Sequence, residues 1–90
     1  MNATDIVYVV CLSFENYNGD YETQKIKFFK AEDSAKQYIA NRIAEIRNNP
    51  ANIVDEAYTN DWRICYTGPN EFGDIESTYE EYSIENHPLL

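Results

Sequence analysis

Two apolar runs near the N-terminus are separated by polar turn residues. Residues 5–14 are rich in Val, Ile, Tyr and Phe, and a second apolar run covers residues 21–30. Asn18-Gly19 lies between them, and this dipeptide readily adopts the two positive φ angles of a type I′ turn. The pattern therefore predicts a β-hairpin centred on Asn18-Gly19.

A turn centred there sets which side chains share a sheet face. Val9 is expected opposite Phe28, and Cys11 opposite Ile26, with Val7 on the same face. The other face is mixed but still apolar, and it places Tyr8, Val10, Leu12 and Phe14 across from Phe29, Lys27, Lys25 and Thr23. A slip of one residue would exchange the two faces.

From residue 32 to residue 47 the apolar period changes to that of a helix. The stripe consists of Ala35, Tyr38, Ile39, Ile43 and Ile46, and Arg42 is the one polar residue on that side. Two acids begin the segment and Arg47 ends it, which suits the helix dipole. We expect this stripe to pack on the hairpin face formed by Val7, Val9, Cys11, Ile26 and Phe28.

The second half of the chain predicts two further strands. Trp62, Ile64 and Tyr66 alternate with Arg63, Cys65 and Thr67, and Gly68-Pro69 ends this strand. Residues 78–85 form the fourth strand, whereas residues 51–60 are compatible with a short helical turn or an irregular crossing. The whole pattern predicts one α+β domain over residues 1–90, with ββαββ order and one amphipathic helix packed on one face of an antiparallel sheet.

The charge of the chain is strongly negative and unevenly distributed. The net charge is −9, and residues 48–90 contain nine acids against the single base Arg63. Such a field repels nucleic acid and anionic membranes and attracts basic protein surfaces. The longest apolar stretch, residues 6–12, is too short to span a bilayer, so we expect a cytoplasmic protein in which Cys11 and Cys65 are reduced.

Residues suited to catalysis or to cofactors are scarce. The only histidine, His87, is fourth from the C-terminal residue, and Glu80 and Glu81 point to opposite faces if their strand is extended. Turn-forming Asn, Asp and Gly explain the oxygen-rich stretches 15–22 and 70–76 without a metal. With no Gly-rich phosphate loop, we expect no cofactor, no direct binding of nucleic acid and no enzymatic activity.

Several segments together resemble a group of short uncharacterised phage and bacterial proteins. They are a first strand with Tyr8-Val9-Val10, a strand ending in Phe28-Phe29, an acidic helix start with Ala35, and a late Tyr82-Ser83-Ile84-Glu85 strand. The resemblance implies a fold. In size and charge the chain also resembles small acidic phage inhibitors of host restriction and CRISPR nucleases, some of which mimic DNA.

These observations favour a binding role for the acidic half. Unpaired acids are rarely buried, and no Lys or Arg follows Arg63, so we expect the carboxylates of residues 71–85 to face solvent or a partner. The partner is then a basic protein surface, such as that of a nucleic-acid-binding protein or a host-defence nuclease. The residues expected to contact it are the acids Asp61, Glu71, Asp74, Glu76, Glu80, Glu81 and Glu85, with Tyr79 and Tyr82 as apolar anchors.

A second hypothesis assigns the chain a structural role. The apolar face formed by Tyr8, Val10, Leu12, Phe14 and Phe29 would be covered by a second copy in a self-associating homodimer. This hypothesis fails if another part of the same chain covers that face.

Overall fold

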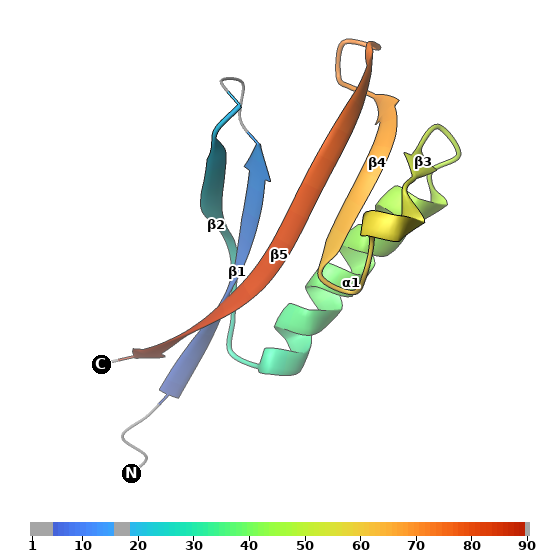
Figure 1. Cartoon of the computed structure of the whole chain (residues 1–90). Helices are drawn as coiled ribbons and strands as arrows, with labels where there is room; N and C mark the ends of the chain where they lie inside the picture. The colour runs from blue at the N-terminus through green and yellow to red at the C-terminus, as the bar shows by residue number, and fades with distance from the viewer. Residues whose placement is uncertain (1–4, 16–18, 90) are drawn as a thin grey trace.

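A computed structural model describes residues 5–15 and 19–89 and shows an antiparallel sheet with one α-helix on one side (Figure 1). The strands lie in the order β2-β1-β5-β4-β3. In chain order the elements are β1 (Asp5–Glu15), β2 (Tyr21–Phe29), α1 (Glu32–Asn48), β3 (Ile53–Val54), the 3-10 turn η1 (Glu56–Tyr58), β4 (Arg63–Pro69) and β5 (Ile75–Leu89). The predicted α+β class and ββαββ order are confirmed, and β3 and η1 occupy the segment left open. Within the described residues, no helix is long and apolar enough to cross a membrane.

The predicted hairpin register holds over only part of its length. Val9 lies opposite Phe28 as expected, but the register shifts after Val10, so that Cys11 lies opposite Lys25. Ile26 is the extra residue of this β-bulge, and the expected pair of Cys11 with Ile26 is therefore wrong. Of the predicted turn, Asn18 lies outside the described residues, and Gly19 has a φ of 83°.

The last strand of the chain lies at the centre of the sheet. β5 has 15 residues and is longer than the predicted segment 78–85. Along one edge it pairs with β1, from Asp5–Leu89 to Phe14–Glu80, and along the other with β4. β5 therefore joins the N-terminal hairpin to the rest of the sheet (Figure 1).

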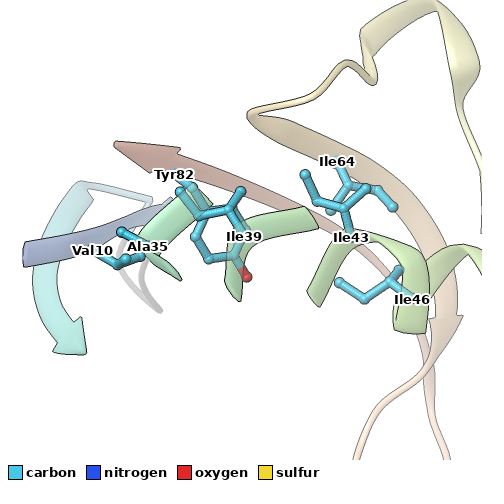
Figure 2. Packing of buried hydrophobic residues seen from close by; sticks show 7 residues of the cluster. All are labelled: Val10, Ala35, Ile39, Ile43, Ile46, Ile64 and Tyr82. Carbon is cyan, nitrogen blue, oxygen red and sulfur yellow. The ribbon is translucent and has the colours of Figure 1, made fainter. Parts of the chain in front are cut away.

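The helix packs on the hairpin face opposite to the one predicted. Figure 2 shows the buried cluster, in which α1 contributes Ala35, Ile39, Ile43 and Ile46, and the sheet contributes Val10, Ile64 and Tyr82. Tyr8, Leu12, Ile26 and Phe29 pack against this cluster, whereas Phe28 on the other face is 61% exposed. The apolar face assigned above to a second copy is thus largely covered by α1 of the same chain.

The neighbour of β1 explains this choice of face. β5 places Ile84 opposite Val10 and Tyr82 opposite Leu12 on the helix side. On the other side it places Ser83 and Glu85 opposite Cys11 and Val9. Only the helix side therefore continues as an apolar surface beyond the hairpin, and packing α1 there removes more apolar area from water. Val9 and Cys11 are nevertheless buried, at 1% exposure each, in the middle of the opposite face.

The C-terminal end of α1 is anchored to β4 through a tight contact. The Asn52 side chain donates a hydrogen bond of 3.1 Å to the backbone carbonyl of Ile46. It lies against Gly68 of β4, where a Cβ atom would be only 2.1 Å from Asn52 Oδ1. A glycine at position 68 thus permits the close approach of the segment after α1 to the sheet.

Candidate binding surface

Two acidic turns lie at the same end of the sheet. The C-terminal end of β1 lies beside the N-terminal half of β5, so the end of β1 and the start of β2 lie at the same end of the sheet as the β4–β5 turn (Figure 1, top). Residues 13–24 and 66–79 contain no Lys or Arg. We call their six carboxylates the acidic end: Glu15, Asp20, Glu22, Glu71, Asp74 and Glu76.

Large apolar side chains are exposed among these acids. Phe72 is 80% exposed, Ile75 69% and Tyr21 70%. An open groove of about 700 Å³ lies between the end of β1 and the first half of β5, and its lining includes Leu12, Phe14, Glu15 and Glu76. Aromatic side chains next to charges are typical of protein interfaces, where they supply the apolar contact area.

The β4–β5 turn is held in one conformation by its own hydrogen bonds. Asn70 Oδ1 accepts from the backbone amides of Phe72 at 2.9 Å and of Asp74 at 3.0 Å. The backbone adds Asn70 N to Asp74 O at 2.8 Å, and Gly73 supplies the positive φ of 83° that the turn requires. Glu71 and Phe72 are thus presented from an ordered turn, which lowers the entropy lost on binding.

The structure brings together only some of the residues predicted from the sequence. Glu71, Asp74 and Glu76 belong to the acidic end, and among the described side chains none of the three forms an ion pair. Asp61 precedes β4 and therefore lies at the opposite end of that strand from the 70–74 turn. Glu81 is exposed on the sheet face away from α1, opposite Arg63.

Glu80 and Tyr82 are buried inside the molecule and cannot contact a partner as predicted. Glu80 is 7% exposed and Tyr82 3%. Both face α1, where Arg42 Nη2 lies 3.3 Å from Glu80 Oε2. The same carboxylate accepts hydrogen bonds from the hydroxyls of Tyr82 at 2.5 Å and of Tyr66 at 3.4 Å. A buried carboxylate needs such partners, because an unpaired charge is very unfavourable away from water.

This cluster perturbs the acidities of the groups around the carboxylate. Burial raises the pKa of the Tyr82 phenol well above its ordinary value, and the hydrogen bond and charge of Glu80 act in the same direction. Burial and the Glu80 charge likewise raise the pKa of Tyr66. Burial opposes the charged form of Arg42, but Glu80 and Tyr82 together outweigh it and raise the pKa of the guanidinium. The raised pKa values keep the Tyr66 and Tyr82 phenols neutral at neutral pH, so they remain hydrogen-bond donors beside the Arg42–Glu80 contact.

Glu85 also has partners inside the chain, which the sequence analysis did not expect. Its carboxylate lies 2.9 Å from His87 Nε2 and 3.8 Å from Lys25 Nζ. The hydrogen bond to His87, followed by the charges of Lys25 and His87, lowers the pKa of Glu85. Tyr79 lies on the same face and donates a hydrogen bond of 3.1 Å to Glu81. Although no Lys or Arg follows Arg63, Lys25 and Arg42 of earlier elements thus pair with Glu85 and Glu80.

Sequence reasoning also missed part of the acidic end. Glu15, Asp20 and Glu22 belong to the first half of the chain, whose total charge is nearly neutral. A local feature of the sequence could have identified them, because these three acids flank a turn without Lys or Arg. For the buried carboxylate the signal was Arg42, since a cation on an apolar helix stripe requires an acidic partner.

A second groove differs from the acidic end in its balance of charges. It has a volume of about 550 Å³ and lies between α1 and residues 60–62, with Lys36, Arg47, Asp61 and Trp62 in its lining. Lys36 is paired with Glu32 at 3.1 Å, and Arg47 is paired with Glu56. Both cations of this groove therefore already have an acidic partner within the chain. In the described part of the protein, no group of three or more His, Cys, Asp or Glu side chains is arranged to hold a metal ion.

Comparison with other proteins gave no match. No protein-family model, curated protein or solved structure matches this chain.

Proposed function

We propose that the protein is a non-enzymatic binding protein that docks its acidic end on a basic surface of another protein. The observation that supports this is that two turns with six carboxylates, in segments without any Lys or Arg, lie at the same end of the sheet, and that Phe72 and Ile75 are exposed at the second turn. The carboxylates attract and orient a basic partner, and the apolar side chains supply the contact area that holds it.

The class of partner that we propose is a nucleic-acid-binding protein, including host-defence nucleases. Such proteins present a basic surface that normally contacts the phosphate backbone. A dense set of carboxylates offers the same sign of charge to that surface, and the protein then competes with nucleic acid for it. The protein acts in this proposal as a DNA mimic and inhibitor in the cytoplasm.

The proposal is tested by comparing the wild-type protein with two variants of equal charge. The first variant neutralises the β4–β5 turn through Glu71→Gln, Asp74→Asn and Glu76→Gln. The control neutralises three exposed acids outside the acidic end through Asp33→Asn, Glu45→Gln and Asp61→Asn. Each protein is immobilised, incubated with host lysate at low salt, and eluted with either a salt gradient or duplex DNA.

The wild-type and control proteins are expected to retain the same basic nucleic-acid-binding protein, and duplex DNA is expected to displace it. The turn variant is expected to lose it at much lower salt, because exposed charges act over a distance that salt shortens. Equal retention by all three proteins contradicts docking through the acidic end. Retention that duplex DNA does not disturb contradicts the DNA-mimic part of the proposal.

A further inference from the structure

One edge of the sheet is long and open. β2 forms this edge over nine residues, and within the described chain nothing pairs with its outer side. The opposite edge is covered, because β3 pairs with β4 and further backbone bonds join Asp55 to Cys65 at 2.8 Å and Asn60 to Arg63 at 3.0 Å. An unpaired strand edge exposes backbone groups that pair readily with another strand.

We propose that β2 pairs antiparallel with β2 of a second copy, about a twofold axis at Gln24. The partner is a second copy because the exposed side chains of β2 complement one another under such an axis. In a symmetric dimer each contact occurs twice, so a self-complementary strand satisfies both halves at once. The axis places the two Gln24 residues directly opposite each other.

The faces of the side chains determine this register. Tyr21 and Phe28 lie opposite Glu15 and Val9, on the sheet face away from α1. Glu22 and Lys27 lie opposite Phe14 and Val10, on the face of α1. Paired residues of an antiparallel ladder share a face, so Tyr21 can pair with Phe28 of the second copy, and Glu22 with its Lys27.

The bulge at Ile26 makes these pairs compatible with one axis. Thr23 then lies opposite Lys25, and Ile26 remains the unpaired residue on both strands, as it does in the pairing with β1. An axis at Lys25 would instead place two lysines opposite each other, which is unfavourable. Of these two registers, the one centred on Gln24 places Glu22 opposite Lys27 and Tyr21 opposite Phe28.

Exposure and charge support contact at this edge. Tyr21 is 70% exposed and Phe28 61% exposed. Two cross-strand aromatic pairs would cover these rings, and two Glu–Lys pairs would lie on the other face. In this dimer Tyr21 and Glu22 of the acidic end would pair with the second copy, whereas the β4–β5 turns of the two copies, with Glu71, Asp74 and Glu76, would point in opposite directions and stay accessible.

A charge exchange tests the register. Glu22→Lys or Lys27→Glu places like charges opposite each other at two positions of the dimer, and each is expected to raise the dissociation constant about tenfold in sedimentation equilibrium. The double exchange Glu22→Lys/Lys27→Glu restores opposite charges and is expected to restore dimerisation. Glu45→Lys on α1 makes the same charge change away from the edge and is expected to have no effect.

A crosslink tests the axis. Gln24→Cys places two thiols opposite each other at the Cα separation that a disulfide accepts, so oxidation is expected to give a covalent dimer. Thr23→Cys lies opposite Lys25 and is expected to remain uncrosslinked, as is the wild-type protein with its native Cys11 and Cys65. Wild-type protein that stays monomeric up to about 1 mM overturns the proposal, and so does a dimer that the double exchange fails to restore.

Discussion

The carboxylate of Glu80 in β5 lies 3.3 Å from the guanidinium of Arg42 in α1, and two tyrosine hydroxyls complete its surroundings. This ion pair joins the helix to the central strand of the sheet. Only the carboxylate is deeply buried, since the side chain of Arg42 is 40% exposed and that of Glu80 9%. Glu80 thus orients α1 on the sheet and is unavailable to a partner protein.

Replacing Glu80 should destabilise the fold. Glu80→Ala leaves the buried hydroxyl of Tyr82 without its acceptor and removes the counter-charge of Arg42, so we expect the free energy of unfolding to fall by about 3 kcal/mol in urea titration. The adjacent exposed acid provides the control, because Glu81→Ala should change stability by less than about 0.5 kcal/mol. Equal effects of the two substitutions would argue against the buried cluster.

Stability should fall at alkaline pH because of Tyr82. Its pKa is raised in the folded state, so the unfolded chain ionises this phenol while the folded protein keeps it neutral. The stabilisation is complete below the ordinary pKa of tyrosine and is lost as the pH rises from there through the folded-state pKa, at up to about 1.4 kcal/mol per pH unit. Unfolding titrations across this range should show a shallower slope for Tyr82→Phe, and an unchanged slope would assign the alkaline loss to other groups.

The two glycines of the second half should respond to substitution for different reasons. Gly68→Ala drives a Cβ into the Asn52 side chain, and we expect a loss of about 2 kcal/mol, since Asn52 must give up its bond to Ile46 or shift β4. Gly73→Ala meets no atom within 4 Å, and only its φ of 83° is unfavourable, at about 1 kcal/mol. Adding Asn52→Ala should recover the stability lost in Gly68→Ala but not that lost in Gly73→Ala. Thermal unfolding of the two double variants would check this.

The sheet face that α1 covers can be tested by truncating one residue on each side. Val10 is fully buried under α1, and Val10→Ala should lower the free energy of unfolding by about 2 kcal/mol. Phe28 is the larger side chain but lies on the open face, so Phe28→Ala should change it by less than about 0.5 kcal/mol at low protein concentration. If Phe28→Ala lowered the free energy of unfolding more than Val10→Ala, α1 would instead cover the face that contains Phe28, as the sequence predicted.

Local patterns predicted the elements well, whereas their packing depended on distant partners. The hairpin, the helix and the two later strands follow from alternation, helical spacing and turn residues within single segments. The face under α1 does not, because both faces of the hairpin are apolar. Ile84 and Tyr82 on one side and Ser83 and Glu85 on the other decide between the faces, and they act only once β5 is known to lie beside β1.

For the candidate surface, too, properties of a single segment were predicted correctly, whereas contacts between segments far apart in the sequence were not. Glu71, Asp74 and Glu76 were predicted correctly to be exposed, because their turn contains no base. Glu80 was predicted wrongly, since its partner Arg42 is 38 positions earlier in the chain. Acids from the first turn join the same surface for an equally non-local reason, namely the antiparallel pairing of β1 with β5.

The central position of β5 has a consequence for the order in which the protein folds. The contacts that join the hairpin to β4 pass through the last strand, with pairs as distant in sequence as Asp5 and Leu89. During synthesis the hairpin and α1 leave the ribosome first, and their apolar surface stays incomplete until β5 inserts between β1 and β4. The sheet therefore cannot close before β5 is available, and until then the edges of β1 and β4 that β5 will occupy stay open to pairing with other strands.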